Sequence, residues 1–94
     1  MKYTQPTLDK IEKIVEESGY IIRYERGSFQ SGFCILEDKK VVVLNKFLQL
    51  EGRINTLIDL IPQLKIGAEA LTPESKKMFD GIIGKYHEAG ENKS

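Results

Sequence analysis

The chain has 94 residues, of which 40% are hydrophobic, and its 14 basic and 14 acidic side chains give a formal net charge of zero. A chain of this length forms a single core, and this hydrophobic share is that of a globular protein and not of a disordered one. The balanced charge removes the overall attraction to phosphate that most nucleic-acid-binding proteins show. We expect one domain over residues 1–89 and a disordered tail over residues 90–94.

Two further features of the sequence indicate where in the cell the protein is located. Cys34 is the only cysteine, which excludes an intramolecular disulfide and favours a reducing environment. The polar first ten residues lack the apolar stretch of a secretory signal, and no apolar run approaches the roughly 20 residues that cross a bilayer. The sequence therefore predicts a cytoplasmic protein without a membrane span.

The first predicted elements are a helix and a strand. Apolar residues recur at steps of three and four at Leu8, Ile11, Ile14 and Val15, which is the pattern of an amphipathic helix. Pro6 suits the first turn of this helix, and Gly19 stands where a left-handed C-terminal cap is wanted. From residue 20 to residue 25 the apolar period changes to two, which predicts a strand.

Two β-branched runs follow, over residues 32–37 and 40–46, and the charged turn between them predicts a β-hairpin. Residues 41–44 are apolar on both faces of the second run. This is typical of a central strand that is covered on both sides, and helices are the expected cover.

The rest of the chain is predicted to be mainly helical. A second amphipathic helix ends near Pro62, residues 63–71 form a loop or a short helical turn, and Thr72 with Pro73 marks the start of a third helix. The expected fold class is therefore α+β: a helix, a three-stranded antiparallel meander, and two helices packed on the sheet.

The residues that could support catalysis or metal binding are few. One cysteine and one histidine, Cys34 and His87, do not make a zinc site, which typically needs four ligands. Cys34 lies between Phe33 and Ile35, so we interpret it as a small core residue, with a reactive thiol as the alternative. Phosphate-binding loops and nucleophile-elbow motifs are absent from the sequence. We expect no metal and no cofactor. These absences favour a non-enzymatic protein and leave an enzyme as the alternative.

Polar residues gather at the predicted ends of strands. We hypothesise a basic corner that binds an acidic peptide, phosphate or carboxylate, formed by Arg23, Arg26, Lys46 and Arg53 with Asn45 beside them. The alternative is purely structural: Asn45 caps a turn, Arg53 pairs with Glu51 or Asp59, and Arg23 is the exposed residue of an alternating strand.

Three aromatic residues, Tyr24, Phe29 and Phe47, fall at or beside turns. Such residues can anchor an interface or close the ends of a thin core, and the small size of the domain favours closing the core. An open sheet edge would offer a surface for a homodimer. Aromatic and basic residues also interleave in single-stranded nucleic-acid binders, but no motif of that class accompanies them.

The element order, residues 19–24, residues 40–45 and the segment 53–61 resemble the opening of the ImmA/IrrE type of zinc peptidase. In that family a strand ending in Asn leads through an Arg into the helix that carries H-E-x-x-H. The comparable helix here reads G-R-I-N-T-L-I-D-L-I-P, so both metal histidines and the catalytic Glu are missing. The resemblance implies a metal-free relative that holds an extended peptide against the sheet edge.

From these observations we expect a non-enzymatic binding or regulatory module that acts through protein contacts, either as a homodimer or with another protein partner. The alternative is a degenerate zincin-like pseudoenzyme, or an enzyme, that binds a small acidic ligand or peptide.

Overall fold

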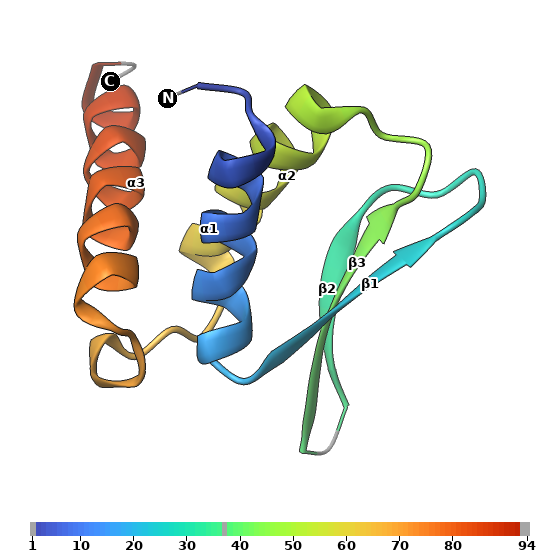
Figure 1. The fold of residues 1–94 in the computed structure, drawn as a ribbon, viewed down its shortest axis with the longest axis horizontal. Coiled ribbons are helices and arrows are strands. Elements are labelled where there is room, and N and C mark those ends of the chain that lie inside the picture. Colours follow the sequence, from blue (N-terminus) through green and yellow to red (C-terminus); the bar gives the residue numbers. More distant parts are fainter. Residues whose placement is uncertain (1, 37, 93–94) are drawn as a thin grey trace.

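The computed structural model describes residues 2–36 and 38–92, in which helices lie on one side of a three-stranded sheet (Figure 1). The mixed helix and strand content confirms the α+β prediction. In chain order the elements are α1 (Gln5–Glu17), β1 (Tyr20–Glu25), β2 (Gly32–Leu36), β3 (Lys39–Asn45), α2 (Leu50–Leu60) and α3 (Pro73–Asn92), with 3₁₀ turns at Ile61–Gln63 and Ala68–Ala70.

The ends of α1 follow the sequence signals. The hydroxyl of Thr4 accepts a hydrogen bond from the backbone N–H of Thr7 (3.3 Å), and Pro6 lies in the first turn. Gly19 follows the helix with a φ of +90°, as a left-handed cap requires. The chain therefore enters β1 directly from α1, and Tyr20 is already buried against the helices.

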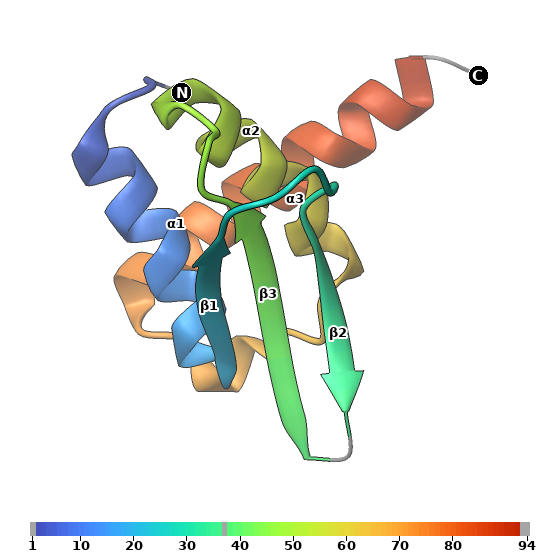
Figure 2. The same ribbon diagram turned by 90° about the vertical axis from the view of Figure 1, so that its right-hand side faces the viewer.

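The sheet is not the predicted meander. Its strand order is β1-β3-β2: β3 pairs with β2 in the antiparallel sense, which confirms the hairpin, but it pairs with β1 in parallel, with Tyr20 beside Lys40 and Glu25 beside Asn45. Residues 26–31 cause this difference, because they carry the chain across the end of β3 to the opposite edge (Figure 2). We name residues 26–31 the crossover loop.

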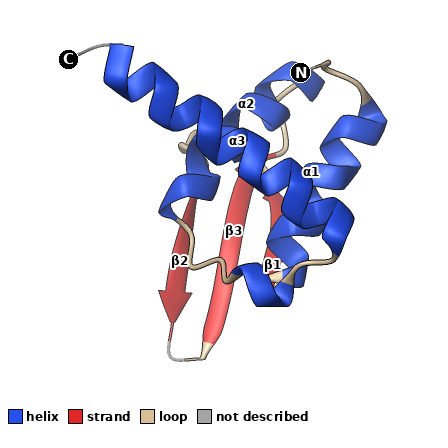
Figure 3. Cartoon of the chain, turned by 90° about the vertical axis from the view of Figure 1, so that its left-hand side faces the viewer, coloured by secondary structure: helices blue, strands red, loops and turns tan. Residues whose placement is uncertain are grey.

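The helices cover one face of the sheet only, so the prediction that helices cover both faces of the central strand is wrong (Figure 1). Nor do both later helices pack on the sheet. α1 packs against β1, α2 and α3, and α3 forms an outer layer on the far side of α1 from the strands (Figure 3). The result is a layered arrangement of sheet, inner helices and outer helix.

The core lies between the sheet and the inner helices, with α3 closing it from outside. Its fully buried side chains come from α1, β3, α2, the turn after α2, and α3: Leu8, Ile11, Ile14, Val15, Val42, Leu44, Ile54, Leu57, Ile61 and Ile82. They include all four residues of the apolar stripe that the spacing predicts for the first helix, Leu8, Ile11, Ile14 and Val15.

α3 begins at the predicted cap, where the hydroxyl of Thr72 accepts the backbone N–H of Ser75 (3.3 Å). The helix includes residues 90–92, which the sequence assigned to the disordered tail, while Lys93 and Ser94 lie outside the described residues. Among the described helices, none is both long and apolar enough to pass through a membrane.

Candidate functional site

Asn45 ends β3 and holds the crossover loop in place. Its side-chain Nδ2 donates to the carbonyl oxygens of Gly27 (2.7 Å) and Phe29 (3.1 Å), and its Oδ1 accepts the backbone N–H of Phe47 (3.0 Å). Its own backbone N–H donates to the hydroxyl of Ser31 (2.8 Å). All these bonds are structural, in keeping with the turn-capping alternative, and a ligand-binding role for Asn45 stays a prediction.

Arg53 lies on α2 and is also committed to internal contacts. Its Nε donates to the carbonyl oxygen of Leu48 (2.9 Å) and one terminal nitrogen donates to that of Lys46 (3.1 Å). Its guanidinium carbon lies 4.7 Å from the centre of the Tyr24 ring, a stacked cation–π arrangement. The partners of Arg53 are therefore backbone oxygens and an aromatic ring, and not the carboxylates that the structural alternative named.

Tyr24 continues this connection from α2 through β1 to α1, because its hydroxyl donates to a carboxylate oxygen of Glu12. Burial of the ring, and then the Glu12 carboxylate, raise the pKa of the Tyr24 hydroxyl. Tyr24 is half-buried on the helix-covered face. Tyr24 thus packs against the core, as the core-closing alternative expects, and an interface role for it stays a prediction.

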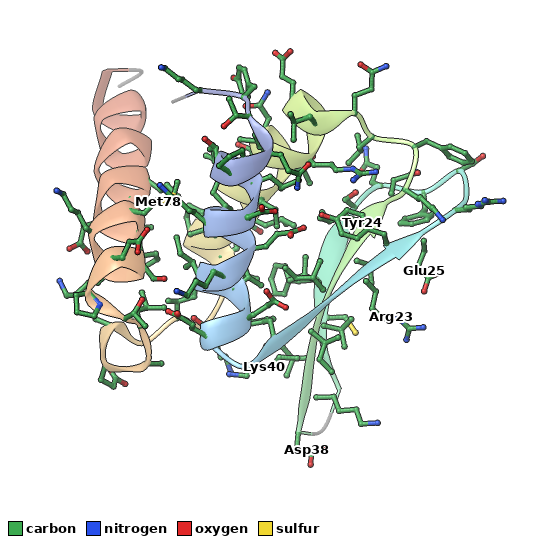
Figure 4. The ribbon with its side chains drawn as sticks, viewed as in Figure 1. Arg23, Tyr24, Glu25, Asp38, Lys40 and Met78 are labelled. Carbon is green, nitrogen blue, oxygen red and sulfur yellow. The ribbon has the colours of Figure 1, made fainter. Side chains whose placement is uncertain are left out.

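The predicted cations do not converge on one corner. Arg23 and Tyr24 are consecutive on β1 and point to opposite faces of the sheet (Figure 4). Arg23 pairs with Glu25 at 3.2 Å on the uncovered face, whereas Arg53 stacks on the covered face. The structure brings Arg53 to Lys46 but leaves Arg23 apart from them. Arg26 and Lys46 are exposed, and anion binding by these residues stays a prediction.

Phe29 and Phe47 are the two candidate interface aromatics that do lie at the surface, with 37% and 71% of their area exposed. Phe29 lies in the crossover loop, and Phe47 follows β3. An interface role for both stays a prediction.

A polar cavity of about 460 Å³ opens beside the crossover loop. Its walls come from the crossover loop, the end of β3, the turn that follows β3, and α2: Phe29, Gln30, Ser31, Asn45, Leu48, Thr56 and Asp59. Among these residues Asp59 is the one that carries a charge, so the cavity suits a neutral polar or cationic group better than an anion. It adjoins the start of β2.

Within the described residues, one face of the sheet has no helix in front of it, which the sequence did not predict (Figure 2). The strand register places Ile21 and Cys34 on either side of Val41, and places Arg23 and Gly32 on either side of Val43. We name this surface, formed by Ile21, Arg23, Glu25, Gly32, Cys34, Val41 and Val43, the open face. No helix of the described residues lies in front of it.

Two apolar side chains of the open face are exposed, Ile21 with 56% of its area and Cys34, whereas Val41 and Val43 are half-buried. The interpretation of Cys34 as a core residue is therefore wrong, because the strand turns it away from the helices. Alternation in the sequence does place Ile21 on the same face as Arg23 and Glu25. Those two charges were the signal that this face meets solvent.

The described residues contain no group of three or more His, Cys, Asp or Glu side chains arranged to hold a metal ion. Comparison with protein-family models, with curated proteins and with solved structures found no significant match. The geometry of the open face and of the polar cavity is therefore the basis for the functional argument.

Proposed function

We propose that this chain is a non-enzymatic protein-binding module that uses the open face of its sheet, and that its partner is a second copy of itself. The observation that carries the proposal is the apolar centre of that face, formed by Ile21, Cys34, Val41 and Val43 and left without a covering helix. Apolar sheet faces in proteins normally pack against another layer. The sheet of a second copy, packed about 10 Å away, would supply this missing layer.

The charges beside this centre favour a second copy over a strongly acidic or basic partner. Arg23 and Glu25 stand two residues apart on β1 and pair with each other at 3.2 Å. A two-fold axis crossing β1 between them would bring Arg23 of each copy towards Glu25 of the other, and such isologous pairing is the rule in homodimers. The net charge of zero adds no overall repulsion between copies.

The size of the open face sets the expected affinity. Three strands about 4.8 Å apart and about five residues long give a footprint on the order of 250 Å². This is well below the roughly 800 Å² per partner of a standard stable interface. We therefore expect a weak dimer, with a dissociation constant in the micromolar range or above.

Sedimentation velocity over a concentration series tests the proposal. The wild-type chain should shift from monomer to dimer between about 10 and 1,000 μM, the range of small interfaces. Val43→Lys places a charge at the centre of the face and should leave a monomer. Arg23→Glu alone should weaken the dimer, and the charge exchange Arg23→Glu with Glu25→Arg should restore it. Lys2→Glu, which makes the same charge change before α1, is the matched control and should dimerise normally.

Cys34 gives an independent measure, because it is exposed in the single chain. Its reaction with a maleimide should slow as protein concentration rises, and Val43→Lys should remove that dependence. Circular dichroism would establish that each variant is folded. A wild-type chain that stays monomeric throughout, or a folded Val43→Lys variant that dimerises as well as wild type, would overturn the proposal.

A second candidate function rests on β2, which pairs only with β3 among the described strands and adjoins the polar cavity. An extended peptide could add to this edge and place a polar side chain near Asp59. The ImmA/IrrE resemblance supports such a metal-free peptide-binding relative. Peptide binding at this edge would survive Val43→Lys, whereas self-association would not. The single cysteine supports a cytoplasmic location for either function.

A further inference from the structure

A second cavity, of about 370 Å³, lies between α1 and α3 on the helical side of the molecule. Lys10 and Lys13 line it from α1, and Glu74, Ser75, Lys77 and Met78 line it from the first turns of α3. Met78 projects from α3 towards α1 (Figure 4). This volume falls within the range of about 300–1,000 Å³ that is usual for small-molecule sites.

The walls of this cavity are fixed by contacts at the start of α3. The backbone N–H of Thr72 donates to the Glu17 carboxylate at the end of α1 (3.0 Å), and Ser75, which is 4% exposed, packs where the helices meet. These contacts hold the first turn of α3 against α1. Lys10 and Lys13 stand three residues apart on α1, and therefore lie on one side of that helix. The cavity is thus formed by the helix packing and does not depend on a loop.

The charge around the cavity is positive, with three lysines and one glutamate, in a chain whose net charge is zero. Lys13 has only a long contact with Glu17 (3.8 Å), and neither Lys10 nor Lys77 has an ion pair among the described residues. By contrast, Lys76 lies beside Lys77 in sequence, does not line the cavity, and pairs with Asp80 at 2.9 Å. The three lysines that line the cavity therefore have a weak ion pair or none among the described residues.

The floor of the cavity is apolar. Met78 presents a flexible thioether side chain, and the methylene stems of the lysines add apolar surface below their charged ends. We propose that this cavity binds a small carboxylate with an apolar body, such as a medium-chain fatty acid anion. The apolar body would lie on Met78, and the carboxylate would lie among the ammonium groups of Lys10, Lys13 and Lys77.

Octanoate is a suitable probe, with octanol as its uncharged counterpart of equal chain length. We expect saturable amide shifts at residues 10–13 and 74–78 in heteronuclear NMR spectra of the full chain titrated with octanoate, and much weaker binding of octanol. Lys77→Gln should weaken octanoate binding about two- to five-fold, the range expected for one exposed ion pair. Lys13→Gln with Lys77→Gln should weaken it further.

Lys76→Gln is the matched control, because it removes a neighbouring positive charge that does not line the cavity. Three results would overturn the proposal: octanol binding as tightly as octanoate, Lys76→Gln weakening binding as much as Lys77→Gln, or no saturable shift at millimolar octanoate. The monomeric Val43→Lys variant should bind octanoate with wild-type affinity. Failure of self-association and failure of this site would therefore be seen separately.

Discussion

At the scale of single residues, Glu17 shows how one carboxylate joins two helices. It lies at the end of α1 and accepts the backbone N–H of Thr72, the cap residue of α3. This backbone bond is the main reason that the pKa of Glu17 is lowered from its usual value of 4.5, with a smaller contribution from Lys13. The charged carboxylate thus stabilises the start of α3 at neutral pH.

Glu17→Gln should lower the thermal stability of the chain at pH 7, because a neutral amide makes a weaker bond to the Thr72 N–H than a carboxylate does. The pKa is lower in the folded state than in the unfolded state. The stabilisation is therefore complete above pH 4.5 and is lost as the pH falls through the folded-state pKa. Thermal denaturation of both proteins from pH 7 to pH 3 should show the difference in Tm closing below pH 4.5.

The matched control is Glu16→Gln, which removes one carboxylate at the exposed neighbouring position. Its effect on Tm should be smaller than that of Glu17→Gln at pH 7. If the two variants behaved alike across the pH range, the stabilisation would come from net charge and not from the bond to Thr72.

At the scale of elements, the sequence did not predict the path of the crossover loop, and so did not predict the strand order. Periodicity was enough to identify the helices and strands, since each depends on residues close in sequence. The path between β1 and β2 was not predictable in the same way, because Arg26, Gly27 and Ser28 resemble an ordinary hairpin turn. What fixes the path is the Asn45 amide, which reaches Gly27 and Phe29 across 18 and 16 positions.

Asn45→Asp tests this role with a nearly isosteric change. The carboxylate can still accept the Phe47 N–H but cannot donate to Gly27 and Phe29, and it would face their carbonyl oxygens. The free energy of unfolding in urea should fall by about 1–3 kcal/mol, the net contribution of two hydrogen bonds at about 0.5–1.5 kcal/mol each. Hydrogen exchange should accelerate over residues 27–32 before it does in α1.

Asn45→Ala should also speed exchange in the crossover loop, because it removes all three side-chain bonds. If exchange in residues 27–32 were unchanged in both variants, the loop would be held by its own local contacts. The Asn45 amide would then not be what directs β2 to the far edge of the sheet.

At the scale of the whole molecule, the open face exists because helices cover only one side of the sheet. Hydrophobic spacing correctly identified the stripes on α1 and α2, but Val41 and Val43 looked as buried as Val42 and Leu44. Strand alternation divides these four residues between two faces. Alternation does not show whether a helix covers each face of the sheet. The open face stays uncovered because α3 packs on α1.

Two isoleucines allow a direct comparison of the covered and uncovered sides. Ile54 on α2 is fully buried, whereas Ile21 on β1 is 56% exposed on the open face. Ile54→Ala should lower the free energy of unfolding by about 2–5 kcal/mol, because it leaves a cavity in the core. Ile21→Ala should cost less than about 1 kcal/mol, the scale of strand propensity alone. Urea denaturation at low protein concentration, where the chain is monomeric, would measure both.

The effects of these two substitutions on self-association should be the reverse of their effects on stability. Ile21→Ala removes apolar surface from the open face and should weaken the dimer, whereas Ile54→Ala, while folded, leaves that surface unchanged. A large stability loss for Ile21→Ala in the monomer would mean that the free chain already covers this face. A second copy would then have no apolar surface to bury there, and self-association through the open face would lose its physical basis.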